Sequence, residues 1–397
     1  MSREKNKNRI NTRVEQKNAY KSRLKKQKQK NKIALLIVVV LLAVIFIGGK
    51  MYLDYRHYHS YKIGGKVEKQ DASATRYEYM GEDIFRYSAN GASLMDVEGN
   101  SLWNQTFSME DPQLSMTDNA AAVYEKQGNQ IYLFDKEKMT GSISTQQPIL
   151  KARVSAAGTL GAILQDGETT WVNFYNPNGK LLASGKTRVD NPGYPVDLSI
   201  SEDGLMIMVS YLFVEGGETT SYVAFYNLGE DGQDKIDNIV SGYKYKGKIV
   251  PEVSYMEKDL ALAFKEDGFV VFTGKKSPKE VTKVKIKEEI VSTFHDKNYV
   301  GFVTRNTSGE EKFSLSLYST RGKKIFEKSF NIPYDTVKIS KGEILMQNGR
   351  QLCIYSSKGV ERYNGTIQEG NLSNAFKLSY NRYLLVLDDG YYTIKLK

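Results

Sequence analysis

The stretch LALAFKEDGFVVFTG, residues 260–274, contains two apolar runs separated by Asp267-Gly268. An Asp-Gly or Asn-Gly pair between apolar runs indicates a tight β-hairpin, because such turns need a positive φ at their central residues and glycine adopts it readily. Residues 260–266 and 269–273 are therefore predicted to form two neighbouring antiparallel strands.

The same hairpin pattern recurs along most of the chain. Successive turn glycines lie 37 to 51 residues apart, with a mean spacing of about 43 residues. The eight turn glycines are Gly91, Gly128, Gly167, Gly217, Gly268, Gly309, Gly349 and Gly390. Their spacing is close to the roughly 40–45 residues of a four-stranded β-propeller blade, so the pattern predicts an all-β protein of the propeller class.

Each repeat has room for four strands. In residues 173–183, NFYNPNGKLLA, the second hairpin strand runs into a short glycine turn and an outer strand. In residues 195–211, PVDLSISEDGLMIMVSY, a further strand precedes the hairpin. We therefore favour a β-propeller of eight four-stranded blades. A seven-bladed ring, an open β-solenoid and a pair of β-sandwiches are the alternatives.

The two ends of the repeat region are expected to meet. The last hairpin ends at Lys397, which leaves no sequence for a fourth strand in the eighth unit. We expect residues 61–68 to supply that strand, since closing the ring removes sheet edges that would template aggregation. The two longest glycine spacings are attributed to insertions, LFVEGGETTS at residues 212–221 and LGEDGQDKIDN at residues 228–238.

Residues 33–49, IALLIVVVLLAVIFIGG, carry neither a charge nor a hydrogen-bonding side chain. Extended to Leu53, the segment would form a helix about 31 Å long, which matches the thickness of a bilayer core. Lys50 lies near its end, where a lysine can extend its ammonium to the headgroups. We predict a transmembrane signal-anchor helix over residues 33–53. A cleaved signal peptide, for which no cleavage site is evident, and a buried core helix are the alternatives.

A strongly basic tail precedes this segment. Residues 1–32 hold thirteen Lys or Arg against Glu4 and Glu15, a net charge of +11, whereas residues 33–397 have a net charge of −1. Positive charge beside a span stays in the cytoplasm, so we expect a cytoplasmic tail and an extracytoplasmic C-terminal part at the cell membrane. With few apolar residues the tail is predicted to be disordered.

The expected partner of the tail is anionic lipid, to which basic residues near the membrane are attracted. An arm that binds a cytoplasmic protein is the alternative, and no motif supports binding to nucleic acid. The chain is thus expected to divide into the tail (1–32), the span (33–53), a juxtamembrane connector that includes the closing strand (54–72) and the extracytoplasmic propeller (73–397).

Few residues offer catalytic or metal-binding chemistry. Of the three histidines, His57 and His59 lie next to the span and His295 lies in the repeats, so a His-rich zinc site is not expected. His295 is the one candidate base for hydrolysis, and no Gly-x-Ser-x-Gly elbow accompanies it. Cys353 lies in an apolar strand and is predicted to be a core residue. We therefore assign no catalytic, cofactor-binding or metal-binding residue and expect no cofactor.

Three other features could suggest a site. Residues 242–248, GYKYKGK, imitate a phosphate-binding loop, but Ile249 replaces its hydroxyl residue, and we expect a basic connector. The acidic residues within 230–237 lack the spacing of the 12-residue calcium loop and are expected to form a solvated loop. Tyr194, in the sequence NPGYPVD, is placed for exposure and is a candidate for a binding role.

Several segments together carry a family resemblance. They read LMDVEGNSLW (94–103), QPILKARVSAAGTLGAIL (147–164), NPGYPVDLSISEDGLMIMVSY (191–211), KIVPEVSYM (248–256) and YYTIKL (391–396). With the basic tail and single span, the chain resembles a bacterial family of single-pass membrane proteins with a propeller-like extracytoplasmic domain of unknown function. The resemblance implies an envelope location and a propeller-like fold, and it supplies no catalytic residues.

The favoured function is a membrane-anchored, non-enzymatic binding or scaffolding module for an envelope protein or a cell-wall polysaccharide. The alternative is an envelope propeller enzyme, either a quinone-cofactor oxidoreductase or a carboxylate-based glycan-cleaving enzyme. An enzyme would need acids such as Asp197, Glu202 or Asp203 to converge at the ring axis. Quinoprotein propellers, to which the outline is similar, repeat a tryptophan motif, whereas this chain has two Trp.

Overall fold

The computed structural model describes residues 30–33, 35–49, 51–53, 55–68, 75–188, 192–307 and 310–397. The chain divides into two compact units, Met1–His57 and Tyr58–Lys397. The disorder predicted for the basic tail and the hairpin turn predicted at Gly309 lie outside the described residues, apart from the last residues of the tail.

Within its described residues, the first unit contains a helix, Lys30–Leu53, of 24 residues. Its apolar side chains, such as Ile45 and Phe46, are exposed. The helix is long and apolar enough to cross a membrane, by length and composition. A helix predicted over residues 33–53 is therefore present.

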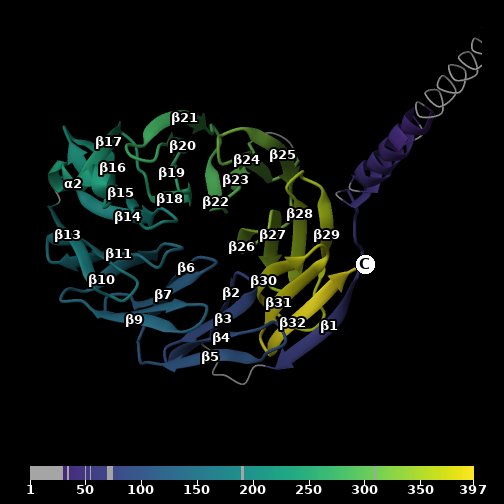
Figure 1. Cartoon of the computed structure of the whole chain (residues 1–397), viewed down its shortest axis with the longest axis horizontal. Coiled ribbons are helices and arrows are strands. Elements are labelled where there is room, and N and C mark those ends of the chain that lie inside the picture. The colour runs from purple at the N-terminus through teal and green to yellow at the C-terminus, as the bar shows by residue number, and fades with distance from the viewer. Residues whose placement is uncertain are drawn as a thin grey trace, which may run out of the picture. The chain divides into compact units, whose positions relative to one another are not determined.

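The second unit is a ring of eight four-stranded antiparallel sheets in the described part of the chain (Figure 1). In seven blades the strands follow sequence order from the inner to the outer position. This confirms the predicted eight-bladed propeller and excludes the seven-bladed ring, the solenoid and the pair of sandwiches.

Blades 1 to 4 follow one another in sequence. Blade 1 consists of β2 (Arg76–Met80), β3 (Asp83–Ser88), β4 (Gly91–Met95) and β5 (Ser101–Thr106). Blade 2 consists of β6 (Pro112–Met116), β7 (Ala120–Glu125), β8 (Gln130–Asp135) and β9 (Met139–Ser144). Blade 3 consists of β10 (Ile149–Val154), β11 (Leu160–Asp166), β12 (Thr169–Tyr175) and β13 (Leu181–Arg188). Blade 4 consists of β14 (Tyr194–Ile200), β15 (Met206–Glu215), β16 (Glu218–Asn227) and β17 (Ile239–Lys246).

Blades 5 to 8 complete the ring. Blade 5 consists of β18 (Glu252–Glu257), β19 (Leu260–Lys265), β20 (Gly268–Thr273) and β21 (Lys279–Lys285). Blade 6 consists of β22 (Ile290–His295), β23 (Tyr299–Arg305), β24 (Phe313–Ser319) and β25 (Lys324–Phe330). Blade 7 consists of β26 (Thr336–Ser340), β27 (Glu343–Asn348), β28 (Gln351–Ser356) and β29 (Glu361–Thr366). Blade 8 consists of β30 (Leu372–Ser379), β31 (Arg382–Leu387), β32 (Gly390–Leu396) and β1 (Tyr61–Glu68).

The predicted hairpins form the two middle strands of each blade. In the opening example, β19 pairs with β20 from Leu260↔Thr273 to Lys265↔Gly268. Gly268 has a φ of +130°, and a Cβ there would lie 2.1 Å from the carbonyl oxygen of Val284 on the outer strand. Glycine is therefore needed both for the turn and for the close approach of β21.

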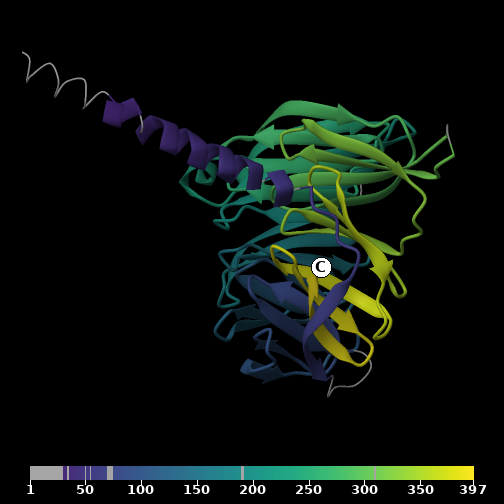
Figure 2. The same ribbon diagram turned by 90° about the vertical axis from the view of Figure 1, so that its right-hand side faces the viewer.

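Ring closure joins the start of the second unit to the end of the chain. β1 pairs antiparallel with β32, from Tyr61↔Leu396 to Glu68↔Gly390, and the two strands lie side by side in Figures 1 and 2. The amide of Lys397 also donates to the carbonyl of Ser60 at 2.8 Å. The closing strand predicted at residues 61–68 is confirmed, and it covers the edge of β32 that would otherwise be open.

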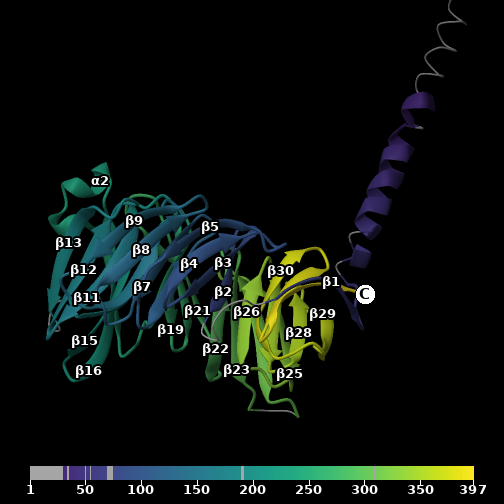
Figure 3. The ribbon, with the colours of Figure 1, turned by 90° about the horizontal axis from the view of Figure 1, so that it is seen from below.

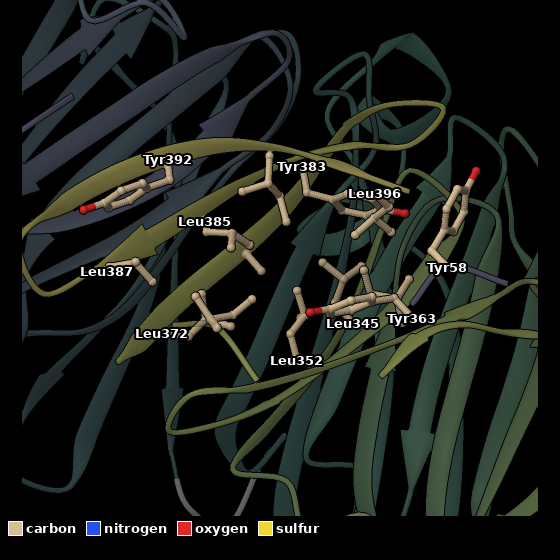
Figure 4. Packing of buried hydrophobic residues seen from close by; sticks show 14 residues of the cluster. Tyr58, Leu345, Leu352, Tyr363, Leu372, Tyr383, Leu385, Leu387, Tyr392 and Leu396 are labelled. Carbon is tan, nitrogen blue, oxygen red and sulfur yellow. The ribbon is translucent and has the colours of Figure 1, made fainter. Parts of the chain in front are cut away.

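The hydrophobic core lies between neighbouring blades, because each sheet buries both faces against the sheets beside it. Figure 4 shows such a layer between blades 7 and 8, with Leu352 and Tyr363 facing Leu385 and Leu396. Tyr58, which precedes β1, belongs to the same layer and is 3% exposed.

Blade 4 is enlarged. Its strands β15 and β16 have ten residues each, and the connection from β16 to β17 contains α2 (Glu230–Gln233) and the 3₁₀ turn η1 (Ile236–Asn238). α2 lies at the outer edge of the ring in two views (Figures 1 and 3). Both segments predicted as insertions are thus found in blade 4.

Candidate binding sites in the channel and between blades 3 and 4

The inner strands of the blades line a central cavity of about 900 Å³. These strands face the middle of the ring in Figure 1. The side chains that they place in the cavity wall include acidic, basic, polar and aromatic residues. The wall includes Glu78, Ser115, Arg153, Ser199, Ser254, His295, Lys338 and Phe376.

One buried polar group in this channel joins blades 7, 8 and 1. The Lys338 ammonium donates to the side-chain oxygen of Asn374, whose amide in turn donates to Glu78 Oε1 at 3.2 Å. The ammonium also lies 3.5 Å from the centre of the Phe376 ring. Burial raises the pKa of Glu78 and lowers the pKa of Lys338 to about 8, because low-dielectric surroundings disfavour both charged forms.

A second group joins blades 3, 4 and 5. Asp197 is fully buried on β14, 2.7 Å from Lys151 Nζ and 3.4 Å from Arg153 Nη2. Its other oxygen accepts the backbone amide of Val253 at 3.0 Å. The carboxylate is therefore fully occupied in holding three blades together, a role that needs both cations because a buried unpaired charge is very costly.

A third carboxylate, Glu252, is bonded to His295. The distance from Glu252 Oε1 to His295 Nε2 is 3.0 Å, and the imidazole stacks on Phe264 with ring centres 5.0 Å apart. Burial alone would raise the pKa of Glu252, but the hydrogen bond from His295 holds it below its usual value. His295, the one candidate base, is the last residue of β22.

The three acids required by the enzyme alternative have separate environments. Asp197 has the structural bonds described above. Asp203 is 2.8 Å from Lys258 Nζ and accepts the Ser201 hydroxyl at 2.6 Å. Glu202 is exposed at the channel wall. Asp197 and Asp203 thus have separate partners within the protein, and Glu202 faces solvent.

The other residues considered in the sequence analysis lie in strands or form ion pairs. Cys353 is buried in β28, where burial raises the pKa of its thiol to about 12. Residues 242–246 of the sequence that imitates a phosphate loop belong to the outer strand β17, so they do not form the predicted connector. Asp231 in the acidic segment is 2.8 Å from Lys276 Nζ. The described residues contain no cluster of three His, Cys, Asp or Glu suited to a metal ion.

The structure corrects the expectation that Tyr194 is exposed. It begins strand β14 and is half-buried rather than exposed, because β14 pairs with the long strand β15. Its hydroxyl donates to Gln165 Oε1 at 3.3 Å, and burial raises its pKa. It lines a small cavity of about 320 Å³ with Tyr124 and Leu150.

A larger groove, which the sequence did not reveal, opens between blades 3 and 4. Its volume is about 750 Å³. Blade 3 contributes Phe174 and the stretch from Ala183 to Thr187 on β13, and blade 4 contributes aromatic residues of β15 and β16. The combination of aromatic faces and polar edges is typical of surfaces that bind other molecules.

The floor of the groove consists of tyrosines. Tyr211 is 1% exposed, and its hydroxyl is 2.6 Å from that of Tyr226, whose pKa is raised to about 12 by burial. Tyr222 stacks on Tyr211 with ring centres 6.4 Å apart. A Cβ at Gly242 would lie 2.0 Å from the Tyr222 hydroxyl, so Tyr222 can cross β17 only because residue 242 is glycine.

One wall of the groove has a strained backbone. Asp237 and Asn238 have φ values of +54° and +59°, two of the four non-glycine residues with positive φ in the described chain. Asn238 also donates from Nδ2 to the carbonyl of Gly232 at 3.1 Å, which helps hold this conformation. Such strain is often concentrated at functional sites. The insertion at residues 228–238 was the one sequence signal that could have located the groove.

Solved structures of low sequence identity share the propeller fold. BamB from Moraxella catarrhalis aligns with a TM-score of 0.51 and 11% identity, covering 85% of this chain and 100% of that chain. Saccharomyces cerevisiae Sqt1 aligns with a TM-score of 0.53 and 10% identity, covering 86% and 100%. Chaetomium thermophilum Sqt1, bound to the N-terminus of the ribosomal protein L10, aligns with a TM-score of 0.51 and 10% identity, covering 85% and 98%.

The sequence comparisons are sparser. No curated protein gives a significant match to the sequence. One family model covers residues 54–396, from just after the N-terminal helix to the end of the last strand. This match spans the whole ring together with the closing strand, and the chain therefore belongs to the family of unknown function DUF5711.

Proposed function

We propose that this protein is a membrane-anchored, non-enzymatic binding module that holds an envelope protein outside the cytoplasmic membrane. The observation that carries the proposal is the groove between blades 3 and 4. It combines a tyrosine floor, polar edges and a strained wall, and it lies between blade 3 and the enlarged blade 4 of a closed ring.

The N-terminal segment supports membrane anchoring. The helix Lys30–Leu53 is long enough to span a bilayer, and residues 1–32 carry a net charge of +11 that favours a cytoplasmic tail. Four residues separate the helix from Tyr58, which is buried in the ring.

The groove favours a protein as the partner. Tyrosine provides a large contact area and a polar hydroxyl, and it is enriched at protein interfaces. The structure of Chaetomium thermophilum Sqt1, which shares the fold, contains a bound N-terminal protein segment. A cavity of about 750 Å³ has room for several side chains of such a segment.

Site-specific crosslinking in living cells tests the proposal. A photo-crosslinking amino acid replaces Phe213, which lines the groove, or Leu102, an exposed residue of the outer strand β5 in blade 1. We expect an envelope protein to crosslink at position 213 and not at position 102. Adding Tyr222→Ala should weaken the crosslink because it removes part of the floor. Equal crosslinking at both positions, or none at position 213, would contradict the proposal.

A further inference from the structure

The outer strands of four consecutive blades carry most of the positive charge of the rim. Strands β13, β17, β21 and β25 follow one another along one half of the ring (Figure 1). Together they hold nine Lys or Arg and two Glu. The cations are Lys186, Arg188, Lys244, Lys246, Lys279, Lys283, Lys285, Lys324 and Lys328. We call these nine residues the cationic belt.

The belt cations point outward because of strand alternation. In β21 the side chains of Lys279, Lys283 and Lys285 are exposed, whereas Thr282 and Val284 between them face inward. In β17, Lys244 and Lys246 likewise alternate with half-buried tyrosines. The charges are therefore presented to solvent along the strands.

The other half of the rim differs. Strands β29, β1, β5 and β9 together hold three cations and two carboxylates, and β5 and β9 have no charged residue. Lysines commonly protect exposed edge strands from aggregation, but all eight outer strands are edges of the same kind. Edge protection alone does not account for a belt confined to blades 3 to 6.

Part of the belt charge is not neutralised within the protein. Four belt lysines form ion pairs: Lys244 with Glu215 at 3.2 Å, Lys246 with Glu218 at 3.8 Å, Lys283 with Glu280 at 2.8 Å and Lys324 with Glu327 at 2.6 Å. Among the described residues, Lys279 and Lys285 form no ion pair, and Lys328 lies over the Tyr355 ring at 5.2 Å. These cations are available to an external anion.

The shape of the rim selects the kind of anion. The belt extends over four of eight blades, about half of a convex circumference. A flat bilayer can touch a convex wall along one line only, whereas a flexible chain can follow it and contact all four strands. We propose that the cationic belt binds a flexible linear polyanion. This binding goes beyond the proposed protein partner and does not depend on it.

Lysine footprinting of the full chain in neutral detergent tests the proposal with inorganic polyphosphate as the probe. Acetylation of each lysine is quantified by mass spectrometry with and without polyphosphate. Because the lysines of the basic tail lie on different peptides, their protection is measured separately from that of the belt. We expect protection of Lys279, Lys285 and Lys328, and none of Lys62 and Lys395, which are exposed on blade 8. Protection should fall steeply with salt, since bound cations release counterions.

Charge reversal provides the matched comparison. Lys279→Glu with Lys285→Glu should raise the polyphosphate concentration for half-protection of Lys328 about tenfold or more, and lower the salt slope by about two. Lys62→Glu with Lys395→Glu makes the same change in net charge on blade 8 and should leave both values within about twofold. Circular dichroism confirms that both variants keep the fold.

Three outcomes would overturn the proposal. The first is uniform protection of lysines on both halves of the rim, and the second is equal loss of protection in the two double variants. The third is protection of the belt by vesicles of anionic lipid but not by polyphosphate, which would assign the belt to a membrane surface.

Discussion

At the residue scale, a network of buried charges surrounds Tyr58, which precedes the closing strand. Arg362 Nη1 is 2.9 Å and Lys377 Nζ is 3.0 Å from Glu343 Oε1, and Tyr383 donates to the other carboxylate oxygen. Arg362 also donates to the Tyr58 hydroxyl at 3.2 Å, and its carbonyl accepts the Tyr58 amide at 2.7 Å. The network thus holds the residue that precedes the closing strand.

Arg362→Ala should destabilise the propeller by about 3–5 kcal/mol, because it removes one partner of a buried ion pair and leaves Glu343 undercompensated. The measurement is the free energy of unfolding from chemical denaturation. Arg305→Ala is the matched control, since Arg305 forms a 2.8 Å pair with Glu289 at the surface. That change should cost at most about 1 kcal/mol. Similar losses in both variants would show that the buried network is not the stabilising feature.

Lys338 should make stability depend on pH. Its pKa is lowered from 10.5 to about 8, so between these values the unfolded chain binds a proton that the folded chain lacks. Stability rises with pH wherever the unfolded state binds more protons. The free energy of unfolding should therefore increase as pH rises above about 8, by at most about 1.4 kcal/mol per pH unit for one proton.

Denaturation series between about pH 7 and 10 test this in Lys338→Met, which should show a smaller rise than the wild type. Lys285→Met, a change at an exposed lysine of β21, is the control and should keep the wild-type slope. An unchanged slope in Lys338→Met would mean that the buried ammonium is not the source.

At the element scale, the interior glycines of the outer strands β13 and β17 have different surroundings. In β17 a Cβ on Gly242 would meet the Tyr222 hydroxyl at 2.0 Å, whereas in β13 a Cβ on Gly185 would have its nearest neighbour, the Val172 carbonyl oxygen, at 3.8 Å. Gly242→Ala should destabilise by about 1–3 kcal/mol through overpacking. Gly185→Ala should be neutral or slightly stabilising, since it restricts the unfolded chain.

A double-mutant cycle isolates the cause. Tyr222→Ala removes the side chain that occupies the space above Gly242, so Gly242→Ala should cost little in that background. Thermal or chemical denaturation of the four proteins gives the coupling energy. Additive effects would contradict the steric explanation.

Ring closure by β1 should be essential for a soluble propeller. A chain that begins at Tyr58 retains β1, whereas a chain that begins at Lys69 leaves β32 as an open edge next to the core of blade 8. We expect the first to be monomeric and to unfold cooperatively, and the second to aggregate and unfold at lower denaturant concentration. Size-exclusion chromatography and denaturation compare them. Equal behaviour would show that closure is dispensable.

At the scale of the whole molecule, the charge is divided between two regions. Residues 1–32 carry +11 and residues 33–397 carry −1, with the apolar helix at the boundary. A membrane-impermeant amine reagent applied to intact, wall-stripped cells should modify exposed propeller lysines such as Lys285 and leave the tail lysines unmodified until the membrane is permeabilised. Modification of the tail alone would reverse the proposed topology.

The hairpins and their number could be predicted from the sequence because each depends on residues close together in the chain. The pattern around Asp267-Gly268 needs a glycine turn and two apolar runs, and neither requires knowledge of the rest of the fold. The closing strand at residues 61–68 could be predicted because a complete ring of eight sheets needs one more strand than the last repeat supplies. The regular repetition of these local hairpin signals therefore allowed the propeller architecture to be predicted.

The binding sites depend on distances that the repeat does not encode. Asp197 meets Lys151, Arg153 and Val253 only when three blades are assembled, and the groove forms only when the insertion in blade 4 stands beside β13. Tyr194 appeared exposed in the sequence, but pairing with β15 half-buries it. Turn chemistry and hydrophobic pattern act between neighbours in the chain, whereas charge pairing and cavity shape act between neighbours in space, and only the closed ring brings those together.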